Sequence, residues 1–74
     1  MSYNELTNQE KIEILKNHVR NYEYAQYNLE AEIIAEQASS TSDSMRILDL
    51  QSQIDNINSK QQALEDEIAR LEAL

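Results

Sequence analysis

Residues 47–71 read ILDLQSQIDNINSKQQALEDEIARL, and one stripe of mainly apolar residues runs through them at alternating spacings of three and four. Its members are Ile47, Leu50, Ile54, Ile57, Gln61, Leu64, Ile68 and Leu71. Apolar side chains that recur about every 3.5 positions form a narrow strip along one side of a helix. Such a strip leaves water only against another helix, so this stretch predicts a coiled coil.

A second stripe with the same spacing lies earlier in the chain. Its members are Ile12, Leu15, Val19, Tyr22, Gln26, Leu29, Ile33 and Glu36. Glycine and proline, the commonest breakers of helices, are absent from the whole sequence. The chain therefore supplies two helices that can cover each other. We expect an all-α fold, an antiparallel two-helix hairpin that assembles further into a dimer, a four-helix bundle or a higher helical oligomer.

The segment between the stripes is the one plausible break in the helical pattern. It reads Ser39-Ser40-Thr41-Ser42-Asp43-Ser44, and such side chains compete for backbone hydrogen bonds and favour caps and turns. We expect one domain with an arm over residues 1–6, a helix over about 7–38, a loop over 39–43 and a helix over about 44–74.

The start of each helix has a candidate cap. Thr7 and Glu10 have the spacing of a capping box, as do Ser2 and Glu5, and we prefer Thr7 because the apolar periodicity starts at Ile12. For the second helix, Thr41 or Ser42 can provide the cap. Asp43 then lies in the first turn, where the helix dipole favours a negative charge.

An unbroken helix is the alternative, because the heptad phase continues across the serine run. In a parallel pair of unbroken helices, Lys11 would face Lys16 and Glu67 would face Glu72, so both ends would repel. An antiparallel pairing avoids this repulsion. It can form within one chain or between two unbroken helices, and the poor helix propensity of the serine run favours the hairpin.

The antiparallel register makes specific pairs. The expected apolar pairs are Ile12 with Leu71, Leu15 with Ile68, Val19 with Leu64, Leu29 with Ile54 and Ile33 with Leu50. On the flanks, Lys16 falls near Glu65 and His18 near Glu67. Near the middle, Gln61 faces Tyr22, and Gln26 lies one layer away. We interpret these three polar positions as a device that fixes the register, because a buried polar layer can specify alignment at a cost in stability.

Composition excludes several classes of function. The chain has 74 residues and no cysteine, so disulfides and thiolate metal sites are excluded, and a core this small favours self-association. The formal net charge is −8 with scattered basic residues, which argues against direct binding of nucleic acid. No apolar run has the roughly 20 residues of a membrane span, and the first residues lack a signal-peptide pattern. We expect a soluble, cytoplasmic protein.

No catalytic or cofactor-binding pattern is present in the sequence. His18 is the only histidine, so no triad can form within one chain, and Leu15 replaces the glutamate that a di-iron bundle motif would need. The run from Asp55 to Lys60 has Ile57 where a calcium loop needs an oxygen ligand. We expect no enzyme activity, no cofactor and no metal.

A further stripe marks the outer face of the first helix, opposite the expected seam. It consists of Tyr24, Tyr27, Ala31, Ile34 and Ala38, with Ala35 beside it. The second helix has only Met45 and Leu48 on its outer side and is polar from Ser52 onward. A fully solvated helix needs no apolar outer face, and tyrosines with small residues suit an interface.

We therefore expect a non-enzymatic, acidic coiled-coil protein with a structural or adaptor role. Its partners would be a second copy of itself and another protein, bound through the outer stripe of the first helix. The alternative is a small acidic inhibitor that blocks an enzyme or a basic nucleic-acid-binding surface.

Overall fold

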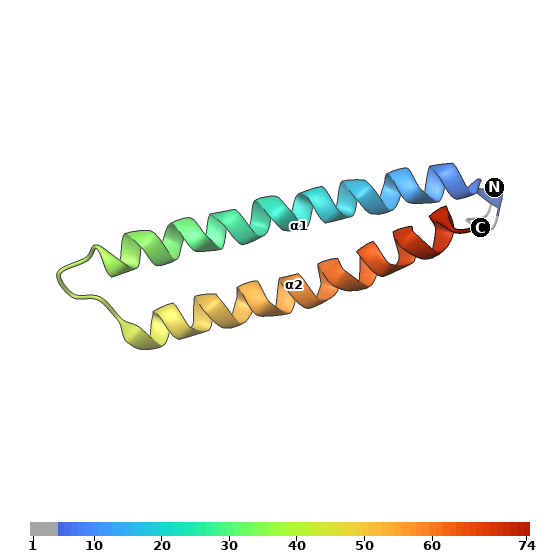
Figure 1. Ribbon diagram of the computed structural model, residues 1–74. Coiled ribbons are helices and arrows are strands. Elements are labelled where there is room, and N and C mark those ends of the chain that lie inside the picture. The colour runs from blue at the N-terminus through green and yellow to red at the C-terminus, as the bar shows by residue number, and fades with distance from the viewer. Residues whose placement is uncertain (1–4) are drawn as a thin grey trace.

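Two long antiparallel helices make up the computed structural model, which describes residues 5–74 (Figure 1). Helix α1 spans Asn8–Gln37 and helix α2 spans Ser44–Glu72. The helices pack along each other, and the molecule measures 54 × 18 × 17 Å. The expected all-α hairpin is confirmed, and the chain folds back within one molecule. Most of the arm expected over residues 1–6 lies outside the described residues.

Helix α1 begins at the capping box that the sequence indicates. The Glu10 backbone N–H donates to Thr7 Oγ1 at 3.1 Å, and the Thr7 backbone N–H donates to Glu10 Oε1 at 3.0 Å. These bonds satisfy two backbone donors that a helix start would otherwise leave free. The backbone N–H of Thr7 donates to the ionised carboxylate of Glu10, and this hydrogen bond, followed by that with the Thr7 side chain, lowers the pKa of Glu10.

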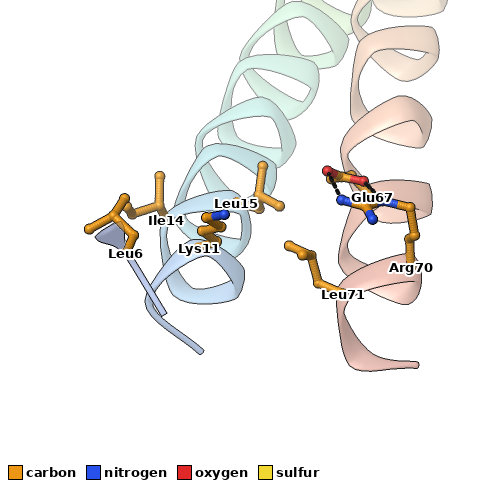
Figure 2. A pocket seen from close by; sticks show the side chains of 7 residues that line it. All are labelled: Leu6, Lys11, Ile14, Leu15, Glu67, Arg70 and Leu71. Carbon is orange, nitrogen blue, oxygen red and sulfur yellow. Dashed lines mark hydrogen bonds and ion pairs between the residues drawn. The ribbon is translucent and has the colours of Figure 1, made fainter. Parts of the chain in front are cut away.

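A cluster of buried apolar residues lies at the open end of the hairpin. Ile12, Ile68 and Leu71 are buried together there, with Leu15 and Val19 packed against them. Figure 2 shows Leu15 of α1 and Leu71 of α2 pointing toward each other across the seam. The start of α1 and the end of α2 are thus held together by apolar packing.

The middle of the seam is looser than its two ends. Near the loop, Ile33 and Leu50 are buried, and Leu50 is only 1% exposed. The remaining seam residues are half-buried: Leu15, Val19, Tyr22, Gln26, Leu29, Ile47, Ile54, Ile57, Gln61 and Leu64. A seam covered by only one partner helix leaves the flanks of its side chains in contact with water.

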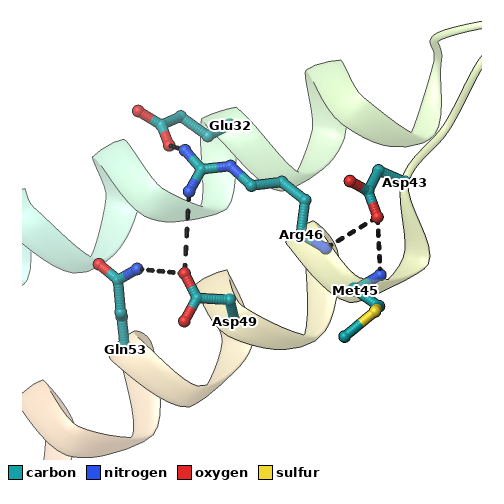
Figure 3. Close-up of polar contacts among 6 residues, drawn as sticks. All are labelled: Glu32, Asp43, Met45, Arg46, Asp49 and Gln53. Atoms are coloured by element: carbon teal, nitrogen blue, oxygen red, sulfur yellow. Dashed lines mark hydrogen bonds and ion pairs between the residues drawn. The ribbon is translucent and has the colours of Figure 1, made fainter.

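The start of α2 corrects the expected cap. Asp43, not Thr41 or Ser42, is the N-cap residue, and its carboxylate accepts from the backbone N–H groups of Met45 at 3.0 Å and Arg46 at 3.2 Å (Figure 3). A carboxylate one position before the helix can reach both free donors, which a residue within the first turn cannot do. Instead, the backbone N–H of Thr41 donates to Ser39 Oγ at 3.2 Å.

The loop is also tied to the end of α1. The Glu36 carboxylate, at the mouth of the seam, accepts from the Asp43 backbone N–H at 2.9 Å. Helix α1 ends one residue earlier than expected, with Ala38 as its C-cap, and α2 ends two residues earlier, with Ala73 as its C-cap. Glu36 thus links the two helix ends that the loop joins.

The cross-helix charge pairs differ from those expected. Between residues 5 and 74, no ion pair joins Lys16 to Glu65 or His18 to Glu67. Glu65 accepts from Gln61 Nε2 at 3.0 Å, and Glu67 binds Arg70 of its own helix. A neighbour one turn away on the same helix is closer to Glu67 than a long side chain that must reach across the seam.

Candidate interaction surface

The outer stripe of α1 is exposed along its whole length. Tyr24 is 59% exposed, Tyr27 is 66% exposed and Ile34 is 55% exposed, and both Ala31 and Ala38 are also exposed. These residues recur on one side of α1 while the seam residues occupy the other, so the hairpin itself cannot cover them. A stripe of two rings, one isoleucine and two alanines at helical spacing is the candidate surface for a partner.

Arg20 extends this surface by one turn toward the N-terminus. Its guanidinium lies 4.7 Å from the centre of the Tyr24 ring, and its Nη2 donates to Tyr24 Oη at 3.3 Å. The contact restricts the ring and places a cation on the same face as the apolar stripe. Tyrosine and arginine are, with tryptophan, the residue types most enriched among the residues that dominate binding energy at protein interfaces.

Helix α2 adds to the exposed apolar surface only near the loop. Met45 is 80% exposed and Leu48 is 64% exposed. Farther along α2, the outer side consists of exposed polar residues: Ser52, Asp55, Ser59, Gln62 and Asp66. Within the part of the chain that the structure describes, the exposed large apolar residues therefore gather in the loop half of the hairpin, apart from Ile14 and Leu74 at the open end.

Sequence reasoning did not identify the pocket at the open end. It has a volume of about 370 Å³ and is lined by Leu6, Lys11, Ile14, Leu15, Glu67, Arg70 and Leu71 (Figure 2). Two features of the sequence point to this pocket. Leu6 lies directly before the Thr7 cap, and Ile14 lies outside the heptad stripe. Both are apolar residues that the seam does not use.

The charged rim of this pocket is internally paired. Arg70 Nη2 donates to Glu67 Oε2 at 2.9 Å, and Arg70 Nε binds the other oxygen. The hydrogen bond to Arg70 lowers the pKa of Glu67, and the charges of Arg70 and Lys11 act in the same direction. The same hydrogen bond raises the pKa of Arg70. Lys11 of α1 therefore acts on Glu67 in addition to Arg70 of α2.

The polar layer in the seam is not closed by hydrogen bonds between the helices. Gln26 Nε2 and Gln61 Oε1 are both buried and have no hydrogen-bond partner among the described residues. Gln61 turns its Nε2 toward Glu65, at the edge of the seam, and leaves its oxygen inside. A buried amide atom without a partner costs about 1–3 kcal/mol. The seam therefore carries an unpaired donor on one helix and an unpaired acceptor on the other.

The described residues offer little for metal chemistry. In residues 5–74, no group of three or more His, Cys, Asp or Glu side chains could hold a metal ion. His18 is exposed on α1. Neither α1 nor α2, as described, has a stretch long and apolar enough to cross a membrane.

Comparison of the chain with protein-family models, with curated proteins and with solved structures found no match.

Proposed function

We propose that this chain is a small acidic coiled-coil module with a structural or adaptor role, which acts by self-association and by contact with another protein. The observation that carries the proposal is the exposure of Tyr27 and Ile34 on a helix whose opposite side already packs against α2. The hairpin seam uses one face of α1. The outer stripe remains for a second molecule.

The composition of the stripe suits protein contact. Tyrosine rings supply large, rigid contact area with a polar tip, and each can bury roughly 150–250 Å². Ala31 and Ala38 between and beyond the larger side chains allow another helix to approach closely. The surface therefore has both the anchors and the space that a helix–helix interface needs.

The small core supports self-association independently. Among residues 5–74, five side chains are buried: Ile12, Ile33, Leu50, Ile68 and Leu71. Domains below roughly 70–80 residues rarely gain enough stability from such a core alone, and this chain has no disulfide to compensate. Covering Tyr24, Tyr27 and Ile34 in an assembly would add apolar burial where the single hairpin lacks it.

The experiment that tests the proposal compares charged variants of the two faces. Tyr27→Glu and Ile34→Glu should split the assembly while most helicity is kept at high protein concentration, because a charge in a buried interface is costly and the seam is untouched. Leu64→Glu, in the seam, should unfold the chain. Sedimentation gives the mass and circular dichroism gives the helicity of each variant.

The matched control is Ser59→Glu, which adds the same charge on the polar outer side of α2. It should leave both mass and helicity unchanged. A wild-type chain that sediments as a monomer at all accessible concentrations would remove self-association from the proposal. Equal masses for wild type, Tyr27→Glu and Ile34→Glu would remove the stripe as the contact surface.

The adaptor role needs a separate experiment. Affinity purification from the native host, with wild type and Tyr27→Glu as parallel baits, identifies partners that depend on the stripe. A partner retained by Ser59→Glu and lost by Tyr27→Glu would define the stripe as its docking site. If every captured protein binds both baits equally, the stripe serves self-association alone.

A second candidate function is a small acidic inhibitor, which is favoured by the formal net charge of −8. An acidic surface of this kind could cover an enzyme or a basic nucleic-acid-binding surface. The inhibitor would bind a basic column at low salt and leave it as salt rises, because salt screens exposed charges. Self-association that is insensitive to salt favours the structural role.

A further inference from the structure

The exposed apolar surface covers only part of the hairpin. On α1 it runs from Tyr24 to Ala38, which is about 21 Å at a rise of about 1.5 Å per residue, on a molecule 54 Å long. Before Tyr24, the outer side of α1 carries the exposed charged residues Glu13, Lys16 and Arg20. Beyond Leu48, the outer side of α2 is polar. A second copy that covers this surface therefore has apolar contact to gain only along the loop half.

The stripe is complementary to itself when a second copy runs in the opposite direction. With Tyr27 of one copy opposite Ala31 of the other, Tyr24 falls opposite Ile34 of the other copy, and the two-fold axis relates equal contacts. Large side chains then meet smaller ones, which is the arrangement that packs without voids. In a parallel pairing each residue would meet its own counterpart, ring against ring and Arg20 against Arg20.

The position of Arg20 favours the same direction. The last turn of α1 has no basic residue, so the negative end of its helix dipole lacks a cation on its own helix. In the antiparallel overlap, Arg20 of one copy comes opposite Ala38 of the other, beside this negative end. Arg20 already lies on the stripe through its contact with Tyr24. The two-fold axis repeats the interaction at the other end of the overlap.

We propose that two copies of this chain pair antiparallel through their loop halves only and form a staggered dimer. This inference rests on the self-association proposed above and adds its direction and extent. This register puts the two-fold axis on the outer side of α1, level with position 29 along the helix. The dimer is then about 70 Å long by the helical rise, compared with 54 Å for one hairpin. The open ends, with their charged outer sides, project in opposite directions.

A nitroxide label on Gln9, exposed near the start of α1, measures the arrangement directly. The staggered dimer places the two labels about 60 Å apart, and a full-length antiparallel overlap places them about 40 Å apart. A parallel pair brings them within about 20 Å, because neighbouring helices lie about 8–10 Å apart. X-ray scattering of the unlabelled protein gives the maximum dimension. A distance near 60 Å with a maximum dimension near 70 Å supports the staggered dimer.

A dimer with labels at 40 Å or less overturns the stagger and leaves self-association standing. A monomer by sedimentation overturns both, so the two proposals fail by different results.

A substitution adds an independent test. Glu23 and Glu30 are exposed along one edge of the stripe, so the antiparallel overlap brings glutamates of two copies together, whereas a parallel pair sets Glu30 beside Ala35.

Glu30→Gln should therefore lower the dissociation constant of the staggered dimer by about threefold, since like charges at a surface repel weakly. The matched control is Asp66→Asn on the outer side of α2, outside the overlap, which should leave the dissociation constant unchanged. A dissociation constant that stays the same for Glu30→Gln, or rises, contradicts the antiparallel direction.

Discussion

Arg46, in the first turn of α2, reaches across to α1 and pairs with Glu32, with 3.2 Å between Nη2 and Oε2 (Figure 3). The same guanidinium lies 3.8 Å from Asp49 on its own helix. The pair joins residues 14 positions apart on either side of the loop. It is the ion pair that links α1 to α2 among residues 5–74, and it lies at the loop end.

Glu32→Gln should lower the stability of the hairpin slightly, by about 0.5 kcal/mol. The loss is small because the Glu32 and Arg46 side chains are both about half exposed, so water and salt screen their charges. Urea unfolding at low salt measures the loss, and 1 M salt should remove most of it. Glu13→Gln, an exposed carboxylate on the outer side of α1, is the control. A loss for Glu32→Gln that persists unchanged at high salt would mean that the side chain stabilises through packing and not through charge.

The cap of α2 gives the second prediction. Asp43→Ala should lower the free energy of unfolding by about 1 kcal/mol, because two backbone donors at the helix start lose their acceptor. Thr41→Ala and Ser42→Ala, the positions favoured from sequence, should each change it much less. Urea unfolding monitored by circular dichroism compares the three variants. Equal losses for Ser42→Ala and Asp43→Ala would contradict the assignment of Asp43 as the cap.

The polar layer of the seam gives the third prediction. Gln61→Ile should raise the melting temperature, because a buried amide oxygen without a partner is replaced by an apolar side chain. It should also broaden the distribution of oligomeric states, since the polar layer no longer disfavours alternative alignments. Sedimentation and thermal unfolding measure the two effects.

Gln62→Ile is the matched control, because Gln62 is exposed and its Nε2 bonds to Asp66 on the outer side of α2. It should not raise the melting temperature. A Gln61→Ile variant that melts lower than wild type, with the same mass in solution, would show that the amide stabilises the hairpin outright.

The open end gives a pH-dependent prediction. The pKa of Glu67 is lowered in the folded state, mainly by the hydrogen bond to Arg70. Its contribution to stability is therefore present above the unfolded-state pKa, near the ordinary value of 4.5, and is lost as pH falls through the lower folded-state pKa. Arg70→Ala should reduce the loss of stability below pH 4.5, since the pair no longer exists to be broken.

The loss of stability is measured from urea unfolding midpoints at fixed protein concentration, at pH values above and below 4.5. Lys60→Ala is the control, because Lys60 is an exposed cation on α2 outside the proposed dimer contact and its loss leaves Glu67 paired. If wild type and Arg70→Ala lose stability in parallel as pH falls, the Glu67–Arg70 pair does not contribute to acid sensitivity. Glu10 should still contribute in both proteins, because the Thr7 cap lowers its pKa independently.

Much of the architecture could be predicted because it depends on periodicity. Alternating spacings of three and four from Ile12 to Ile33 and from Ile47 to Leu71 define two helical faces, and the polar run between them marks the turn. The Thr7 cap could also be predicted, because its two hydrogen bonds involve residues three positions apart. The outer stripe was found from the same periodicity, and the structure adds how far each of its side chains is exposed.

The failed predictions all concern choices between acceptors or partners at similar distances. Thr41, Ser42 and Asp43 are all competent caps, and the path of the loop after Ser39 decided for Asp43. Glu67 could pair with cations on either helix. It pairs with Arg70 because only one helical turn separates the two side chains. Sequence spacing names the candidates in such cases but does not rank them.

The sequence by itself determined that the chain is helical, which residues form the seam and that the first helix carries a second apolar face, whereas the structure decided that the chain breaks into two helices that fold back on each other within one molecule. The features determined by the sequence follow from the order of apolar and polar side chains, since helical geometry fixes which residues share a side. Only the tertiary structure decided that the Gln26 donor and the Gln61 acceptor stay unpaired, that Glu36 ties the loop, and that Leu6 and Ile14 border a pocket beside Leu71. Those features depend on rotamers and on the loop path, because atoms far apart in sequence meet only after both helices are packed.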